Sequence, residues 1–467
     1  MGGELLFGDA AELIRNTVQP RDVAEVPYIG LEHIEEGTLR LNSYGSSKNV
    51  DSAKFLFREG DILFGKLRPY FRKVIRAPFD GVCSTDIWVV RAKNGVDQGY
   101  LYYWMAAEDF VEFATSGSEG TRMPRAKWEH VSRFSRPMLD ISEQRAIAHI
   151  LGTLDDKIEL NRQMNRTLEA MAQALFKSWF IDFDPVVVNA LRVGNPIPEQ
   201  FAQRACLCRS FGRQAAHYRD NPGALRLPED TLRQFPDRFR DSELGPIPEG
   251  WTVKSLFELF ELIGGGTPKT SVPEYWNGDI PWFSVVDAPN PTDVFVIDTE
   301  KRITQLGIEK SSTKILPVGT TIISARGTVG KCALVGVPMA MNQSCYGIQG
   351  REGVSDVFTY YTIRLQVSDL QRSGHGSVFN TITRETFKSI KVPFSGTNLT
   401  QQFEGFVSNF MDQILHNLFQ IDTLAKLRDT LLPKLISGEL RLSAAALETL
   451  AAQAGVPDAE RLLEDVL

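Results

Sequence analysis

Two long heptad repeats constrain this chain more than any other feature of its sequence. The first spans residues 147–179 and the second spans residues 403–435, and each seam position of the first recurs 256 residues later. The first seam is Ile147, Leu151, Leu154, Ile158, Asn161, Asn165, Leu168, Ala172, Leu175 and Trp179. The second seam is Phe403, Val407, Phe410, Ile414, Asn417, Ile421, Leu424, Arg428, Leu431 and Leu435. Spacings that alternate between three and four residues place these side chains on one stripe of a helix, so the sequence predicts two long helices in a shared register.

The two seams are interrupted by polar residues at the same point. Asn161 corresponds to Asn417, and Asn165 adds a second amide to the first seam. A buried Asn lowers the stability of a coiled coil but fixes its register, because only one alignment lets the amides bond each other. We therefore expect Asn161, Asn165 and Asn417 to set the register of a helix pair. The alternative is two unrelated amphipathic helices, each packed on its own domain.

The ends of these helices can also be predicted. No Gly or Pro occurs between Thr153 and Phe183, so nothing in that stretch interrupts the first helix. Pro433 should kink or end the second helix near its last turns, and Gly438 is suited to stop it.

The regions that precede the helices repeat as well. Residues 60–66 (GDILFGK) resemble residues 319–325 (GTTIISA), and each stretch leads into a basic segment. Residues 116–123 (SGSEGTRM) correspond to residues 372–379 (RSGHGSVF). The chain therefore has the order globular domain, helix, linker, globular domain, helix, and we expect a mixed α/β (α+β) fold with a pseudo-twofold internal repeat.

This order predicts six segments along the chain. They are a first globular domain (1–140), a first long helix (141–183), a linker (184–249), a second globular domain (250–397), a second long helix (398–440) and a C-terminal tail (441–467). Frequent Pro and Gly in the linker favour a largely irregular connector with some helical content.

Composition narrows the class of protein. No apolar run reaches the length of a membrane helix, and the first residues lack the pattern of a signal peptide, so we expect a cytoplasmic protein without a membrane. Five scattered cysteines argue against a disulfide framework. The net charge of −7 argues against DNA binding through overall charge. Local clusters of basic residues are nevertheless compatible with a subunit that recognises DNA within a larger complex.

Motifs for catalysis and for metal binding are missing from the sequence. Residues 327–332 (GTVGKC) differ from a phosphate-binding loop, because Ala325 replaces its first glycine and Cys332 its metal-binding hydroxyl residue. Residues 264–270 (GGGTPKT) do not form a dinucleotide-binding pattern, and we expect a flexible loop there. The histidines show no triad order or metal-ligand spacing. We therefore expect no catalytic residue and no metal site.

Instead, the basic and Gly/Ser-rich segments point to nucleic acid. Reading a DNA sequence requires donors and acceptors that reach base edges, with basic groups on the phosphates. The candidate DNA-binding residues of the first repeat are Lys66, Arg68, Arg72, Lys73, Ser116, Thr121, Arg122, Arg125 and Lys127. Those of the second repeat are Arg326, Thr328, Lys331, His375, Ser377, Asn380 and Arg384. Because these loops differ between the repeats, we expect the two halves to read different sequences.

The motifs also resemble a known family. Val26–Ile34 (VPYIGLEHI), Gly60–Pro69, Ser142–Val186, Asp241–Trp251, Gly265–Ser284 and Ile322–Lys331 are together similar to specificity subunits of type I restriction–modification systems. The resemblance implies two target-recognition domains separated by an antiparallel pair of long helices, which are the central and C-terminal conserved regions of that family. It implies double-stranded DNA, two methylation subunits and restriction (translocation) subunits as partners. It also implies that S-adenosylmethionine, ATP and Mg²⁺ bind to those partners and that this chain carries no cofactor.

Two other functions stay open at the level of sequence. A self-contained DNA methyltransferase with a fused recognition domain would bind S-adenosylmethionine by itself. A coiled-coil scaffold would bind protein rather than DNA, and the basic loops argue against it only modestly.

Overall fold

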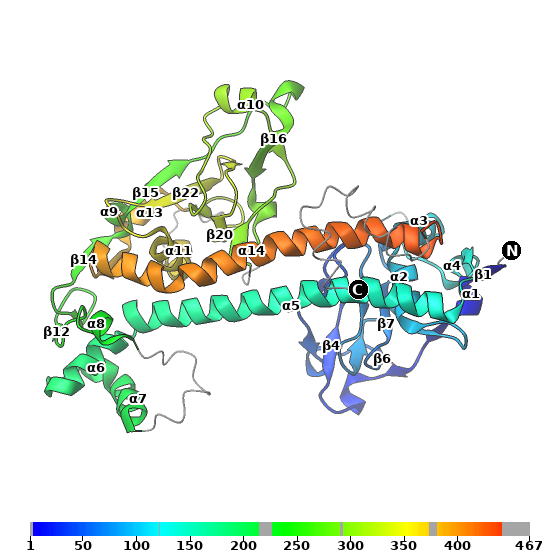
Figure 1. The fold of residues 1–467 in the computed structure, drawn as a ribbon, viewed down its shortest axis with the longest axis horizontal. Coiled ribbons are helices and arrows are strands. Elements are labelled where there is room, and N and C mark those ends of the chain that lie inside the picture. Colours follow the sequence, from blue (N-terminus) through cyan, green and yellow to red (C-terminus); the bar gives the residue numbers. More distant parts are fainter. Residues whose placement is uncertain (1–2, 121, 214–226, 290–292, 373–380, 441–467) are drawn as a thin grey trace. The chain divides into compact units, whose positions relative to one another are not determined.

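The computed structural model describes residues 3–120, 122–213, 227–289, 293–372 and 381–440, which form two compact units (Figure 1). Unit 1 is the described part of residues 1–159 and 421–467, and unit 2 is the described part of residues 160–420. Unit 1 is therefore assembled from two separate stretches of chain, whereas unit 2 comes from a single stretch.

Two helices of 40 residues each, α5 (Ile141–Phe180) and α14 (Thr397–Ile436), correspond to the two heptad repeats. α14 ends shortly after Pro433, and Gly438 follows with a left-handed φ of +73°. Proline lacks the N–H that a further helical turn needs, and glycine adopts positive φ without a Cβ penalty. The predicted end of this helix is confirmed.

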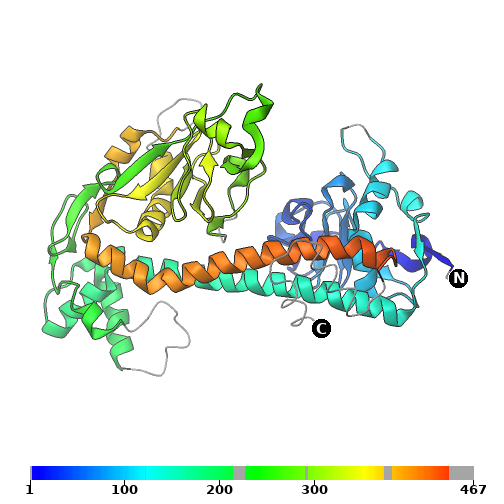
Figure 2. The ribbon, with the colours of Figure 1, turned by 45° about the horizontal axis from the view of Figure 1, so that its top comes forward.

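The heptad seam is buried between the two helices within each unit. In unit 1, Leu151 and Leu154 of α5 belong to one buried cluster with Leu431 of α14. In unit 2, Trp179 of α5 belongs to one buried cluster with Phe403 of α14. Within unit 2, Asn161, Asn165 and Trp179 of α5 contact Gln420, Asn417 and Phe403 of α14, respectively. The two helices are therefore antiparallel there, and Figures 1 and 2 show them side by side. The alternative that each helix packs only on its own domain is wrong.

Each unit carries a sheet in which four antiparallel strands follow the same order, and the sheet of unit 2 adds a fifth strand in parallel. In unit 1 the order is β2 (Ala11–Ile14), β10 (Ile87–Ala92), β7 (Ile62–Gly65) and β8 (Val74–Arg76). In unit 2 it is β15 (Phe260–Gly264), β22 (Cys345–Gly350), β19 (Thr321–Ser324), β20 (Cys332–Val335) and β17 (Phe295–Val296). Strands β7 and β19 contain the repeated apolar runs, so the internal repeat of the sequence is a repeat of sheet topology.

A second sheet in each unit contains a parallel strand pair. In unit 1 the order is β3 (Thr17–Val18), β6 (Lys54–Phe57), β9 (Gly81–Cys83), β4 (Pro27–Ile29) and β5 (Gly45–Ser46). In unit 2 it is β18 (Arg302–Ile303), β16 (Trp276–Phe283) and β21 (Ala340–Met341). The pairs β4–β9 and β16–β21 are parallel, and the other pairings in these sheets are antiparallel. The expected mixed α/β fold is confirmed.

Short elements connect each sheet to the long helices. Unit 1 contains β1 (Glu4–Leu6), α1 (Phe7–Ala10), α2 (Gln98–Ala106), α3 (Glu108–Ser116), α4 (Trp128–Val131) and β11 (Ser135–Pro137). Unit 2 contains β14 (Thr252–Ser255), α9 (Leu256–Leu259), α10 (Gln305–Glu309), α11 (Asp356–Leu365), α12 (Val367–Arg372), α13 (Arg384–Ser389) and β23 (Lys391–Phe394). The pairs β1–β11 and β14–β23 bring the start of each globular part to its end, directly before a long helix.

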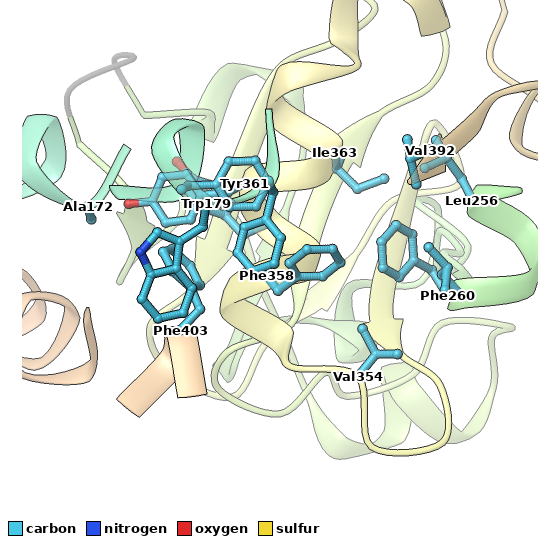
Figure 3. Close-up of a cluster of buried hydrophobic side chains, with 14 of the residues drawn as sticks. Ala172, Trp179, Leu256, Phe260, Val354, Phe358, Tyr361, Ile363, Val392 and Phe403 are labelled. Atoms are coloured by element: carbon cyan, nitrogen blue, oxygen red, sulfur yellow. The ribbon is translucent and has the colours of Figure 1, made fainter. Parts of the chain in front are cut away.

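Aromatic side chains attach α11 to the helix pair in unit 2. Trp179 of α5, Phe403 of α14 and Phe358 and Tyr361 of α11 lie together in one buried cluster (Figure 3). The rings of Tyr361 and Phe403 are 5.9 Å apart and nearly perpendicular, an edge-to-face contact that adds to the burial of their apolar area.

In each unit a carboxylate of α5 accepts a hydrogen bond from a tyrosine of the globular part; Glu169 is buried and Asp155 is partly buried. In unit 1, the Tyr103 hydroxyl of α2 donates to Asp155 at 2.7 Å, and Arg428 donates to Asp155 at 2.8 Å. In unit 2, the Tyr361 hydroxyl donates to Glu169 at 2.7 Å, and Arg364 pairs with the same carboxylate. Burial raises the pKa of Glu169, and Arg364 opposes this effect. Each cluster fastens a globular part to the helix pair through charges that would be unfavourable if left unpaired.

The connector between the halves contains more helix than expected. Its described part begins with α6 (Asp184–Val193) and α7 (Ala202–Arg213) and includes α8 (Glu229–Leu232), β12 (Phe239–Arg240) and β13 (Ile247–Pro248). Arg204 of α7 pairs with Asp184, and the Asn189 amide donates to the carbonyls of Leu232 and Phe235 at 2.9 and 2.8 Å. These contacts order a segment whose Pro and Gly content predicted irregular structure.

Candidate nucleic-acid interface

The two basic clusters of the first repeat form one surface in unit 1. The segment 66–73 follows β7, and the loop 119–127 follows α3. The Arg68 N–H donates to the Pro124 carbonyl at 2.7 Å, and the Ala126 N–H donates to the Lys66 carbonyl at 2.9 Å. Two segments whose bonded residues lie 56 and 60 positions apart in sequence are thus joined backbone to backbone.

A third segment, residues 84–86 between β9 and β10, completes this surface. The Lys66 N–H donates to the Asp86 carbonyl at 2.9 Å. The Arg125 guanidinium donates to both carboxylate oxygens of Asp86, at 2.9 and 3.3 Å. Burial lowers the pKa of Lys66, and the charge of Asp86 acts in the opposite direction. Asp86 therefore anchors the basic groups gathered around it.

Unit 2 contains the same arrangement built from different side chains. The Ala325 N–H donates to the Ser344 carbonyl at 2.7 Å, and the Ile382 N–H donates to the Ala325 carbonyl at 3.0 Å. These bonds match the Lys66–Asp86 and Ala126–Lys66 bonds of unit 1. The second repeat therefore keeps these two backbone connections of the first, while the side chains at the joined positions differ.

Some predicted DNA-binding residues are exposed on these segments. In unit 1, Arg68 and Arg122 are exposed, and the Arg68 guanidinium donates to the Arg122 carbonyl at 3.4 Å. In unit 2, the exposed residues are Arg326, Thr328, Lys331 and Arg384. Exposed guanidinium and ammonium groups at this position are available for phosphate contacts.

Other predicted residues are engaged within the protein. Arg72 donates to the Ala106 carbonyl at 2.7 Å and to Asp429 at 3.3 Å, and Lys73 donates to the Leu31 carbonyl at 2.8 Å. Lys127 pairs with Glu119, and the Ser116 hydroxyl donates to the Phe113 carbonyl at 2.8 Å. A phosphate contact by Arg72 or Lys73 would replace these internal bonds. Thr121, His375, Ser377 and Asn380 lie outside the described residues.

A turn with two left-handed residues was not evident from the sequence. Arg68 and Arg72 have φ values of +52° and +48° and flank a single 3₁₀ turn, Pro69–Phe71. Positive φ is unfavourable for a residue with a Cβ, and such strain is concentrated at functional sites. The turn contains Tyr70, which is 50% exposed, and the Arg68 guanidinium lies over the Phe71 ring, 6.0 Å from its centroid. An aromatic ring next to a guanidinium suits contact with nucleic acid.

The register amides lie within unit 2. The Asn417 Nδ2 donates to the Asn165 Oδ1 at 2.8 Å, and both residues are buried. Asn161, also buried, donates instead to the Gln420 Oε1 at 3.0 Å. The Gln413 Nε2 donates to the Asn417 Oδ1 at 2.7 Å. The two glutamines of α14 were not recognised from the sequence, because they lie beside the seam rather than on it.

Neither a metal site nor a membrane span is found in the described part of the chain. No cluster of three or more His, Cys, Asp or Glu side chains there could bind a metal ion. None of the helices described is long and apolar enough to cross a membrane. A hollow of about 500 Å³ on unit 2 is lined by Phe257, Glu261, Arg351 and Arg384, among others.

A family model matches the chain in two stretches. The family is described as type I restriction modification DNA specificity domain, and the matched residues are 8–170 and 248–417. Together they span more than half of the chain, and each stretch contains one repeated sheet and at least half of the long helix that follows it.

Named relatives and a solved structure agree with this match. The chain is 28% identical over 408 residues to the type I restriction enzyme HindI specificity subunit of Haemophilus influenzae, covering 83% of this chain and 88% of the relative. It is 30% identical over 191 residues to the MjaIX specificity subunit of Methanocaldococcus jannaschii, covering 40% of this chain and 44% of the relative. Its fold is similar to the crystal structure of the type I restriction–modification system S subunit from M. genitalium, with a TM-score of 0.52, 14% identity and coverage of 95% and 97% of the two chains. The resemblance inferred from the sequence motifs is confirmed.

Proposed function

The chain belongs to the family of type I restriction modification DNA specificity domains, and from this premise we propose that it selects the DNA sequence on which a type I restriction–modification complex acts. It is the recognition subunit of that complex, and the chemistry belongs to its partners. The observation that carries the proposal is the surface formed by three joined segments, which occurs once in each unit with equivalent backbone bonds.

The difference between the two surfaces supports a bipartite target. Lys66 of unit 1 is replaced by Ala325 in unit 2, and Asp86 is replaced by Ser344. Base edges in the major groove present different patterns of donors and acceptors, so different side chains on one backbone frame select different bases. The target is therefore asymmetric, with two unlike half-sites separated by base pairs that are not read.

The partners follow from the same role. The chain binds double-stranded DNA in the cytoplasm together with two methylation subunits and with restriction subunits. S-adenosylmethionine, ATP and Mg²⁺ bind to those subunits. The net charge of −7 supports this dependence on partners, because an acidic chain gains little from long-range attraction to phosphates.

The test is methylation-sensitive long-read sequencing of DNA from cells that express this chain with its methylation partner. We expect one motif made of two unlike half-sites with a fixed gap. The partner alone serves as the control and should give no such motif. Methylation by this chain alone would favour the self-contained methyltransferase, and a complex that methylates without sequence preference would contradict the proposal.

A further inference from the structure

The loop before β10 and its counterpart before β22 occupy equivalent positions in the two units. In unit 1, the Ser84 N–H donates to the Ile29 carbonyl at 2.9 Å; in unit 2, the Asn342 N–H donates to the Phe283 carbonyl at 2.9 Å. The middle residue of each loop is exposed: Thr85 in unit 1 and Gln343 in unit 2.

Each middle residue precedes a residue that is bonded to the basic segment. Thr85 precedes Asp86, whose carbonyl accepts from the Lys66 N–H, and Gln343 precedes Ser344, whose carbonyl accepts from the Ala325 N–H and, at 3.2 Å, from the Arg326 N–H. Gln343 is thus attached through the backbone to the segment that carries the exposed Arg326. If the two units read different bases, each needs a polar side chain of its own at the same position, next to basic groups that can contact phosphates. Thr85 and Gln343 meet this requirement.

The side chain of Gln343 is oriented by a neighbouring loop. The Thr267 hydroxyl donates to the Gln343 Oε1. Among the described residues, the Gln343 Nε2 makes no hydrogen bond. A glutamine amide has two donors on nitrogen and two acceptor sites on oxygen, so one acceptor site and both donors remain for a ligand.

Two glycines allow the Thr267 loop to approach so closely. A Cβ on Gly265 would overlap the Asn342 carbonyl, and a Cβ on Gly266 would overlap the Ser312 side chain. The loop is further bonded by the Gly266 N–H to the Met341 carbonyl at 3.0 Å and by the Trp282 ring N–H to the Gly266 carbonyl at 3.0 Å. The expectation that residues 264–270 form a flexible loop is therefore wrong, because glycine serves here for close packing.

We propose that Gln343 reads an adenine in the half-site recognised by unit 2, with Thr267 as the positioning residue. This inference rests on the proposed function. A glutamine amide in the major groove pairs with adenine by donating to N7 and accepting from the N6 amino group. Thr267 removes the amide's rotational freedom before DNA binds, which lowers the entropic cost of that pairing. Thr85 is the equivalent reading position for the other half-site.

The experiment uses the full chain in complex with its methylation subunit. The complex selects duplexes from a random-sequence pool, and the same variants are scored by long-read methylation sequencing. Gln343→Ala should lower affinity for the preferred duplex by roughly 10- to 100-fold and remove the adenine preference at one position of one half-site. Thr85→Ala should relax one position of the other half-site only.

Thr267 is tested by a conservative pair of variants. Thr267→Val removes the hydroxyl donor and should weaken the same adenine preference as Gln343→Ala, whereas Thr267→Ser retains the hydroxyl and should restore it. Gln305→Ala is the matched control, because Gln305 is an exposed glutamine of unit 2 that is bonded within α10 to Glu309. It should leave both half-sites unchanged.

The outcomes separate the inference from the proposed function. If Gln343→Ala retains the preference at every position, or loses both half-sites together, the assignment of Gln343 is wrong. If Thr267→Ser behaves like Thr267→Val, the positioning role is wrong. A wild-type complex that selects no bipartite motif would overturn the proposed function instead.

Discussion

The buried amide pair of Asn165 and Asn417 gives a sharp test of how the helix pair is stabilised. Each residue is 1% exposed, and the two side chains are joined by a hydrogen bond of 2.8 Å. We consider the exchange of each Asn for Leu, singly and together. Leucine is common at such a seam position, so its side chain should fit between the two helices.

The two single variants should each be destabilised. Asn417→Leu leaves the Asn165 Oδ1 without its donor, and Asn165→Leu leaves the Asn417 Nδ2 without its acceptor. A buried polar group that loses its partner costs about 1–3 kcal/mol. Replacement of both partners removes the unpaired group, so the double variant should be close to neutral or more stable. Independent effects would instead sum to about 2–6 kcal/mol.

Amide hydrogen exchange measures this locally, which suits a chain of two units better than a single global unfolding curve. The peptides to follow cover residues 160–172 and 410–420. Exposed Met164 of α5 supplies the control, Met164→Leu, which should leave the exchange rates unchanged. A double variant that exchanges as fast as the sum of the single effects would refute the reasoning, because the two amides would then be uncoupled.

Three further predictions concern the interface, the buried charges and the helix length. Arg68→Ala should weaken DNA binding by the complex and reduce the slope of log affinity against log salt concentration by about one, and equal slopes for wild type and Arg68→Ala would contradict this. Arg72→Ala should mainly lower the melting temperature, because Arg72 is bonded to Ala106 and Asp429. Glu169→Ala should destabilise unit 2 by about 3–5 kcal/mol, measured by hydrogen exchange of peptides from unit 2, because it leaves the Arg364 charge and the Tyr361 hydroxyl without this carboxylate. Glu169→Gln should lose less stability, and unchanged exchange rates for Glu169→Ala would show that the pair contributes nothing. Seven residues inserted after Glu159, together with seven after Gln420, add about 10 Å to each helix and leave the Asn165–Asn417 and Asp155–Arg428 bonds on their own sides of the insertions. Long-read methylation sequencing should therefore show both half-sites kept and the unread gap changed. An active complex with an unchanged gap would contradict this prediction.

The helix pair was the most predictable part of the fold. A heptad seam reports burial directly, and its positions such as Leu154 and Leu424 are fully buried. The partner of each amide was less predictable. The repeat suggests that Asn161 and Asn417 are equivalent, but antiparallel pairing places Asn165 opposite Asn417 and gives Asn161 the partner Gln420. Residues at corresponding positions of the two repeats are therefore not the residues that contact each other across the helix pair.

The interface was predicted in outline only. Clusters of Arg and Lys indicated two segments that the structure joins backbone to backbone in unit 1, because charge is visible in sequence. Which charges are engaged internally depends on tertiary contacts, as for Arg72 with Asp429, 357 residues further along the chain. Thr85 and Gln343 were missed because a single exposed polar residue has no signature, and their equivalence appears only when the backbone bonds of the two units are compared.

The discontinuity of unit 1 has a consequence for its synthesis. Its core includes Leu424, Leu431 and Leu435, which leave the ribosome long after the rest of that core. At roughly 5–20 residues per second, the intervening chain takes on the order of tens of seconds to make. During that time Leu151 and Leu154 lack their partners on α14, while unit 2, a single stretch, can complete its own core first. The unit that begins the chain is thus the last to finish folding, and its apolar helix face needs shielding on the nascent chain.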